Sequence, residues 1–133
     1  MSTFKVKVIT PDRVFYDGEV QHIVVRTTEG DTGILKNHEN YVASLEVGEM
    51  KMKINDEWKY AALADGVIKV GKDMTTILSH SCEWADEIDV DRAKKAQENA
   101  RTSLELKKSD LEFDIATLKL KRAINRINIA NRW

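Results

Sequence analysis

Apolar and polar residues alternate in short runs through residues 1–82, which is the period-two pattern of half-buried β-strands. The clearest runs are Phe4-Lys5-Val6-Lys7-Val8 and Met50-Lys51-Met52-Lys53-Ile54. Turn-forming residues separate the runs, among them Asn55-Asp56-Glu57 and Gly71-Lys72-Asp73. The pattern predicts roughly eight to ten short strands in a β-sandwich or barrel.

Two glycine-containing stretches in this region are expected to change the direction of the backbone. Asp17-Gly18 is a strong tight-turn pair, and it predicts the end of a short strand that begins at Arg13. Gly30-Asp31-Thr32-Gly33 predicts a sharp turn before Ile34.

The periodicity changes after Cys82, because the rest of the chain contains no Gly or Pro and its apolar residues recur every three or four positions. The expected stripes are Val90, Ala93, Ala96 or Gln97, Ala100 and Leu104 on one helix, and Phe113, Ala116, Leu120, Ala123 or Ile124, Ile127 and Ala130 on the other. Asp89 and Ser109-Asp110 are suited to cap them. A short connection predicts an antiparallel αα-hairpin, and its alanine-rich contact predicts low local stability.

Bulk properties narrow the class of protein. The formal net charge is −1, so the whole molecule is not an electrostatic nucleic-acid binder. No apolar run approaches the about 20 residues that span a bilayer, and Met1 to Thr10 alternates rather than forming the apolar core of a signal peptide. A single Cys82 favours a reducing compartment, with the cytoplasm as the default.

Charge is polarised along the helical region. Five acids lie close together at its start (Glu83, Asp86, Glu87, Asp89 and Asp91), and no acid follows Asp114. In a closed hairpin Arg92, Arg122 and Arg126 converge, and three guanidinium groups suit a polyphosphate. The alternative is a salt-bridge face, in which Glu83, Glu87 and Asp91 pair with those arginines.

No catalytic pattern stands out. His22, His38 and His80 are scattered without metal-ligand spacing, and the glycine-bracketed stretch lacks the Lys and Ser/Thr of a phosphate loop. The sequence therefore offers no candidate nucleophile or general base for an enzymatic function.

Three stretches carry a resemblance to a known family. They are Thr10-Pro11-Asp12 with Phe15-Tyr16-Asp17-Gly18, Glu29-Gly30-Asp31-Thr32-Gly33-Ile34-Leu35 with His38, and Ile88-Asp89-x-x-Arg92-Ala93. Together they resemble the epsilon subunit of bacterial F-type ATP synthase over essentially the full length of the chain. The last stretch is similar to the nucleotide-binding motif of the members that bind ATP.

The resemblance implies an α+β chain in two parts. Residues 1–84 would form an N-terminal flattened β-sandwich of about ten strands that binds gamma and the c-ring, and residues 85–133 a C-terminal antiparallel two-helix hairpin with a regulatory role. It implies a non-catalytic rotor subunit of the central stalk, whose helices extend into the alpha/beta catalytic head and inhibit ATP hydrolysis. The subunit would be peripheral on the cytoplasmic face of the bacterial plasma membrane, without direct insertion.

The resemblance also implies a regulatory ATP, with no metal or prosthetic group. Its site residues would be Glu83, Ile88, Asp89, Arg92 and Ala93 from the first helix region, with Arg122 and Arg126 from the second. Asp89 and Glu83 would accept from the adenine amine, the main chain near Ile88 and Ala93 would complete that edge, and the arginines would hold phosphates. Asn99 stands where strongly binding members carry another Arg, so weaker ATP binding is expected.

Partner contacts are implied in the same way. Asp31 and His38 would lie near the gamma/c-ring contact, although Lys36 and Asn40 stand where prolines are usual. The basic run containing Lys119, Lys121 and Arg132 would dock on an acidic surface of the beta subunit. The role of Trp133 stays open between an apolar anchor and a frayed end.

Two rival functions remain open. One is a free-standing ATP-sensing module with the same fold. The other is a nucleic-acid binder that uses the basic second helix, which is disfavoured because that helix lacks interleaved aromatic residues and the strands predict no basic β face.

Overall fold

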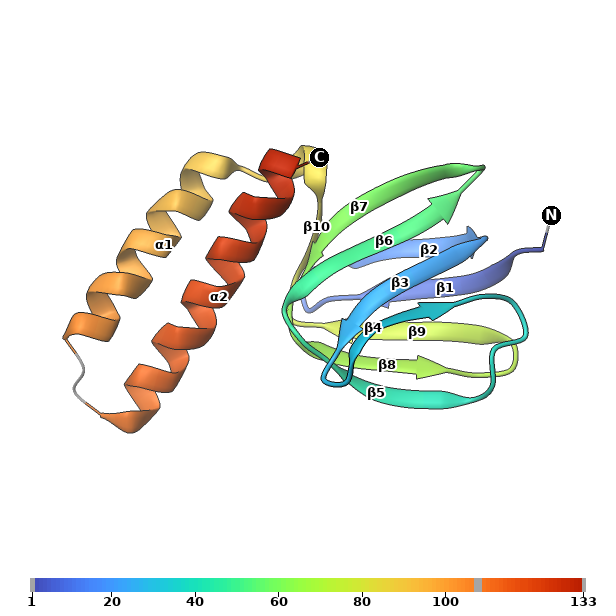
Figure 1. Cartoon of the computed structure of the whole chain (residues 1–133), viewed down its shortest axis with the longest axis horizontal. Helices are drawn as coiled ribbons and strands as arrows, with labels where there is room; N and C mark the ends of the chain where they lie inside the picture. Colours follow the sequence, from blue (N-terminus) through green and yellow to red (C-terminus); the bar gives the residue numbers. More distant parts are fainter. Residues whose placement is uncertain (1, 107–108, 133) are drawn as a thin grey trace. The chain divides into compact units, whose positions relative to one another are not determined.

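The structure is a computed structural model that describes residues 2–106 and 109–132. Its backbone contacts divide the chain into two compact units, Met1–Trp84 and Ala85–Trp133. Among the described residues the first unit holds the strands, and the second holds a short 3-10 helix and two α-helices (Figure 1). The sandwich followed by a helical pair confirms the fold class expected from the sequence.

The first unit is built from short, mostly antiparallel strands. They are β1 (Phe4–Ile9), β2 (Val14–Val20), β3 (His22–Thr27), β4 (Gly30–Ile34), β5 (Tyr41–Leu45), β6 (Gly48–Ile54), β7 (Glu57–Leu63), β8 (Gly66–Val70), β9 (Met74–Ser79) and β10 (Cys82–Trp84). Their hydrogen-bonded order is β10-β7-β6-β3-β5-β8-β9-β1-β2, with β4 added to β3.

This order folds into two layers. The first layer contains β10, β7, β6, β3 and β4, and the second contains β5, β8, β9, β1 and β2 (Figure 1). The ladder passes between the layers at the Thr27–Leu45 pair of β3 and β5. In the second layer β1 runs parallel to β9 and antiparallel to β2.

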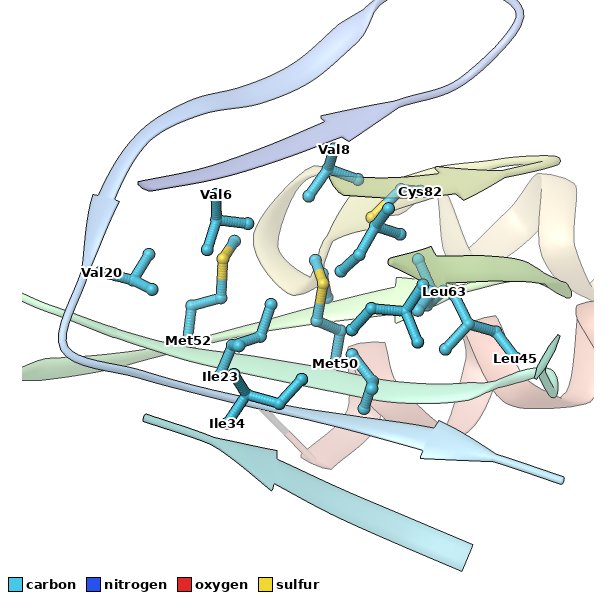
Figure 2. Packing of buried hydrophobic residues seen from close by; sticks show 14 of the residues in the cluster. Val6, Val8, Val20, Ile23, Ile34, Leu45, Met50, Met52, Leu63 and Cys82 are labelled. Atoms are coloured by element: carbon cyan, nitrogen blue, oxygen red, sulfur yellow. The ribbon is translucent and has the colours of Figure 1, made fainter. Parts of the chain in front are cut away.

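The core lies between the layers and follows from the alternation in the sequence. Val6 and Val8 on β1 and Met50 and Met52 on β6 are each 0% exposed. Figure 2 shows the two methionines reaching from one layer toward the valines of the other. Flexible thioethers fill such a core without the shape constraint of branched side chains.

The turns confirm one prediction and correct another. Asn55 and Asp56 have φ angles of 51° and 65° between β6 and β7, as a tight hairpin turn requires. Asp17-Gly18 does not end a strand, because β2 continues through it and Gly18 pairs with Val6. A Cβ at Gly18 would lie 3.0 Å from the Tyr16 hydroxyl, so this glycine makes room for the tyrosine ring.

The predicted turn at Gly30 to Gly33 is also displaced. Both glycines belong to β4, and the chain reverses just before it, where the Thr27 hydroxyl donates to the Gly30 carbonyl at 2.9 Å. Gly30 has a φ of 117°, so a residue without a side chain is needed at the exit of that turn.

The second unit contains η1 (Ala85–Glu87), α1 (Val90–Glu105) and α2 (Asp110–Arg132). Both predicted caps are confirmed. Asp89 Oδ1 accepts from the Arg92 amide at 3.1 Å, and Ser109 Oγ accepts from the Glu112 amide at 3.1 Å. The two helices lie side by side and antiparallel (Figure 1).

Small residues dominate the contact between the helices. Ala93 and Ala100 on α1, and Ala116 and Ala123 on α2, are buried at a spacing of seven residues, which keeps them on one face; we call these four residues the alanine seam. Ala93 and Ala123 are equally far along the chain from the centre of the connection between the helices, and so are Ala100 and Ala116. Ala93 therefore lies at the level of Ala123, and Ala100 at the level of Ala116.

The expected stripe on α2 was right only in part. Of its alternatives Ala123 and Ile124, Ala123 is buried and Ile124 is 36% exposed, and Phe113 is 40% exposed. Ile129, outside the predicted stripe, is 3% exposed. At 3.6 residues per turn, Phe113 and Ile124 lie about 60–80° around the helix from Ala116, beyond the narrow strip that an alanine contact covers.

Candidate functional site

The second layer presents an apolar row on its outer face. Val14, Ile9, Leu78 and Val67 are consecutive cross-strand neighbours on β2, β1, β9 and β8. Val14, Leu78 and Val67 are 53%, 51% and 42% exposed. We call these four residues the apolar row; a contiguous exposed apolar patch of this kind marks an interaction surface.

Strand register creates this row. Val8, Ile77 and Ile68 point into the core, so their chain neighbours point outward. Much of the rest of this outer face is charged, since Lys5 lies opposite Glu19 and Lys7 opposite Asp17. Val42 and Met74 are also exposed on it, opposite Lys69 and Lys5. The apolar row itself occupies the end of the layer where β1 and β9 terminate.

Asp31 and His38, the residues expected at the gamma/c-ring contact, lie at opposite ends of β4. Asp31 is beside the β3–β4 turn and forms an ion pair with Arg26, with 3.2 Å between Arg26 Nε and Asp31 Oδ1. The same end of the sandwich holds the apolar row. Thr27, before the β3–β4 turn, pairs with Leu45, and Leu45 pairs with Gly66, the residue before Val67 of the row. Asp31 and His38 are therefore too far apart to belong to one small contact with a partner.

His38 lies beyond the other end of β4, in the loop that leads to β5. Its Nδ1 is 2.8 Å from the Glu39 carbonyl, and its ring meets Tyr41 edge-on at 5.9 Å. It lines a pocket of about 330 Å³ that the start of β1 and the β8–β9 turn also border. Lys5, Lys36 and Lys72 are among the residues that line it.

The residues expected to hold ATP are divided between the two units. Glu83 is in β10, opposite Ala62 of β7, so it is a sandwich residue and not part of the first helix region. This corrects the sequence interpretation, which grouped Glu83 with the first helix region although it began the hairpin itself at residue 85. The strand that was missed, β10, has only 3 residues, which is too short to show an alternation of apolar and polar positions.

The remaining candidates belong to the hairpin. Ile88 is 8% exposed and precedes the cap residue Asp89. Arg92 is exposed on the first turn of α1, and Arg122 and Arg126 are half-buried on α2. Because Ala93 and Ala123 share a level, the three guanidinium groups belong to the same end of the hairpin.

Local hydrogen bonds restrict what this end can offer a ligand. The Arg92 amide is held by Asp89 Oδ1, and the Ala93 amide donates to the Asp89 carbonyl at 3.0 Å. The Ala93 amide is thus committed to the helix, and its side chain is 0% exposed. Glu87, Arg122 and Arg126 each take part in a polar or electrostatic interaction already, so a ligand and the salt-bridge alternative compete for the same groups.

The other candidates are on exposed helix positions. Asn99 is exposed on α1, seven residues after Arg92. Lys119, Lys121 and Arg132 are exposed on α2, and Trp133 lies outside the described residues. Within residues 2–106 and 109–132 no group of three His, Cys, Asp or Glu side chains has metal-binding geometry, and no helix is long and apolar enough to cross a membrane.

The apolar row was not identified from the sequence. Exposed apolar residues such as Val67 and Leu78 are indistinguishable from core residues until the register fixes which face of the sheet they occupy. The signal was present as two apolar residues in succession, Val8-Ile9, Val67-Ile68 and Ile77-Leu78, in strands that otherwise alternate.

A sandwich with an apolar outer row, followed by two helices joined by an alanine seam, defines a docking module with a helical appendage. The family model described as ATP synthase, Delta/Epsilon chain, beta-sandwich domain matches residues 3–85, and the long alpha-helix domain of the same family matches residues 86–131. The chain belongs to the ATP synthase delta/epsilon chain family, which confirms the resemblance found in the sequence.

Individual relatives agree with this assignment. The ATP synthase epsilon chain of Ruminococcus albus is 44% identical over 133 residues, covering 99% of both chains. That of Alkalihalophilus pseudofirmus is also 44% identical over 133 residues, covering 99% of this chain and 100% of its own.

Solved structures share the fold at lower identity. A chain of the Euglena gracilis mitochondrial ATP synthase (OSCP/F1/c-ring) superposes with a TM-score of 0.78 at 20% identity, over 94% of this chain and 79% of its own. One from the Tetrahymena thermophila mitochondrial ATP synthase (central stalk/c-ring) gives 0.69 at 14% identity, over 97% of both.

Proposed function

We propose that this chain is a non-catalytic rotor subunit in the central stalk of a bacterial F-type ATP synthase, where it couples the gamma subunit to the c-ring and regulates ATP hydrolysis through its helical hairpin. Bacterial relatives named ATP synthase epsilon chain support the assignment to the synthase. The observation that carries the regulatory part is the alanine seam.

The apolar row is the surface that we assign to gamma. Its three most exposed side chains would be removed from water in a protein–protein contact, and each buried aliphatic side chain contributes about 1.5–3 kcal/mol. Charged pairs on the same face, such as Lys7 opposite Asp17, would form a polar rim.

We assign the opposite end of the sandwich to the c-ring. His38 and the pocket beside it lie there, whereas Asp31 is at the end that holds the apolar row. Two contacts at the two ends of one rigid sandwich suit a subunit that transmits torque between two partners. In this assignment Asp31 belongs to the gamma side and His38 to the ring side.

The hairpin has the properties of a two-state element. Alanine buries much less apolar area than leucine, so the contact between α1 and α2 stabilises the closed form weakly. A partner that binds the separated helices more tightly than the hairpin would shift the population toward the open form. The catalytic head of alpha and beta subunits is that partner in our proposal.

The end of α2 supplies the charge for this inhibitory contact. Lys119, Lys121 and Arg132 are exposed, and no acid follows Asp114. Such a helix end is suited to an acidic surface on the beta subunit, and its attraction would weaken with salt.

ATP would act as the opposing ligand that keeps the hairpin closed. Arg92, Arg122 and Arg126 would bind its phosphates, with Asp89 accepting from the adenine amine beside Ile88. Asp89 Oδ1 already caps α1, so the second carboxylate oxygen is the one available. Because Arg92 is on α1 and the other two arginines are on α2, one nucleotide would tie the two helices together.

Attachment to the c-ring would make the chain peripheral to the bacterial plasma membrane on its cytoplasmic face. Its contact with the membrane would be indirect, through the ring. The alternative function, a free-standing ATP-sensing module of the same fold, needs the hairpin site but not the apolar row.

Co-elution with gamma separates the two functions. The full chain is mixed with purified gamma and then with a catalytic head that contains gamma, and complex formation and ATP hydrolysis are measured. We expect co-elution and a lower hydrolysis rate. ATP binding without co-elution would leave the free-standing module as the function, and co-elution with unchanged hydrolysis would remove the regulatory part.

A further inference from the structure

The outer face of the first layer carries a small cluster that no part of the proposed function uses. His22 on β3 lies opposite Lys53 on β6, and Lys53 lies opposite Trp58 on β7. Lys51, two positions before Lys53 on the same strand, points to the same face. We call His22, Lys51, Lys53 and Trp58 the His22 cluster.

Aromatic contacts hold the cluster together. The rings of His22 and Trp58 are 5.2 Å apart between centroids, and Lys51 Nζ is 5.0 Å from the centroid of the Trp58 ring. On the other side, a Cβ at Gly33 would lie 2.9 Å from His22 Nε2, so the glycine on β4 leaves the space that His22 occupies. The side chains are thus positioned rather than freely extended.

Positive charge in the cluster has no acidic partner among the described residues. Neither lysine ammonium group forms an ion pair there. Nearby acids have other interactions, since Asp56 Oδ1 accepts from Gln21 at 3.1 Å and Asp31 pairs with Arg26. Glu49, two positions before Lys51 on the same face of β6, also takes part in an interaction already. Burial, together with the charges of Lys51 and Lys53, lowers the pKa of His22, which indicates a locally positive potential.

We propose that the His22 cluster is a docking site for an acidic peptide segment, in an extended conformation, whose carboxylates are two residues apart. Lys51 and Lys53 are two residues apart on one strand, so their side chains repeat about every 6.4–6.8 Å, and alternate residues of an extended peptide repeat at the same distance. Trp58 supplies apolar contact for the chain between the carboxylates.

The chemistry favours carboxylates over phosphates and nucleic acid. Lysine is a point charge, whereas the bidentate forks that select phosphate are arginines, and the cluster has none. The cluster offers one indole ring rather than a row of aromatic faces on which successive nucleic-acid bases could stack. This inference is independent of the ATP synthase assignment, and it places a modest basic β face where the sequence predicted none.

Nuclear magnetic resonance of the full chain tests the proposal at this site. The probe is a synthetic peptide of alternating Glu and Thr, and the readouts are the ring protons of His22, the indole N–H of Trp58 and the pKa of His22. We expect saturable shifts at both residues and a rise in the His22 pKa, because bound carboxylates favour the imidazolium.

Matched double variants localise the binding. Lys51→Gln with Lys53→Gln removes the cluster's charges, and Lys7→Gln with Lys69→Gln removes two lysines from the outer face of the second layer. We expect the first pair to weaken peptide affinity at low salt by about tenfold or more and the second pair to leave it within about twofold. The single variant Lys53→Gln, read by the same shifts, replaces the first pair if that pair does not fold.

Three results would overturn the proposal. One is equal affinity in both double variants, which would place binding elsewhere, as on basic α2. Another is the absence of shifts at His22 and Trp58. The third is a response of His22 to inorganic phosphate or oligothymidylate as strong as to the peptide, which would assign the cluster to a different ligand class.

Discussion

Val67 and Leu78 lie directly opposite each other on β8 and β9, and both side chains face solvent. Their register neighbours extend the same apolar surface to Ile9 and then Val14. In our proposal this row is the surface that binds a partner, and we assign that partner as gamma.

Replacing Leu78 by Lys is therefore expected to weaken gamma binding without unfolding the sandwich. The charge would be desolvated at the centre of the contact, and the loss of about 1.5–3 kcal/mol of apolar burial corresponds to about tenfold or more in the dissociation constant. Titration calorimetry of the full chain with gamma measures it.

Thr76→Lys is the matched control, because Thr76 is on the same face of β9, opposite Lys69, outside the apolar row. We expect little change in gamma affinity there. Equal losses in the two variants would show that the row has no special role.

The cap of α1 gives a prediction about stability. Asp89→Ala removes the acceptor of the Arg92 amide and is expected to lower the free energy of unfolding of the hairpin by about 0.5–2 kcal/mol. Asp89→Asn keeps an acceptor and should retain most of that stability. Thermal unfolding followed by helical circular dichroism compares them, and similar losses would show that charge, rather than the cap, is what matters.

The hairpin could be predicted from sequence because its signals are local. The absence of Gly and Pro, the two cap residues and the recurrence of alanine are read within a few positions of one another. The prediction failed in how many apolar residues the contact between the helices covers. Phe113 has the right spacing for a broad apolar stripe, but the helices meet along alanines. Which of several neighbouring apolar residues is covered depends on how closely the partner helix approaches.

The sandwich was predictable in kind but not in register. Alternation gave the strands, but Asp17-Gly18 was assigned to a turn because the need of Tyr16 for space is not visible locally. Both the apolar row and the His22 cluster join residues from three or four strands. Only cross-strand pairing brings them together, and short-range patterns do not determine it.

Acidification is expected to act through His22. Its folded pKa is below the ordinary value of 6.5, so between those two values the unfolded chain binds more protons than the folded chain. The free energy of unfolding should therefore fall as the pH drops below about 6.5, while above that value His22 contributes no pH dependence. Urea unfolding of the wild type and of His22→Gln at several pH values isolates this component.

Lys51→Gln provides an internal check, because removing one of the two repelling charges should bring the His22 pKa closer to its ordinary value and shrink the pH dependence. A pH dependence that persists unchanged in His22→Gln would assign it to other groups.

Nucleotide binding gives the next prediction. Arg92→Ala and Arg126→Ala should each abolish measurable ATP binding in calorimetry, because one arginine comes from each helix. Asn99→Arg should strengthen it, since one charge-assisted hydrogen bond contributes about 1.5–3 kcal/mol, or about tenfold to a hundredfold in affinity. Arg101→Ala, an exposed change on α1 outside the proposed site, serves as the control.

A flat titration up to millimolar ATP would make the arginines a salt-bridge face or a dock for the beta subunit. Regulation would then come from the rotor contacts alone.

Ala100→Leu is the variant that shows whether closure of the hairpin controls hydrolysis. Ala100 is 3% exposed in the alanine seam, and a larger side chain there should destabilise the closed hairpin by about 1–3 kcal/mol while leucine keeps the helix intact. The measurement is the ATP hydrolysis rate of a catalytic head with gamma and the full chain, with exposed Glu98→Leu as the control. We expect a lower rate for Ala100→Leu than for the wild type and the control. An unchanged rate, together with earlier melting of the hairpin, would show that hairpin closure does not control hydrolysis.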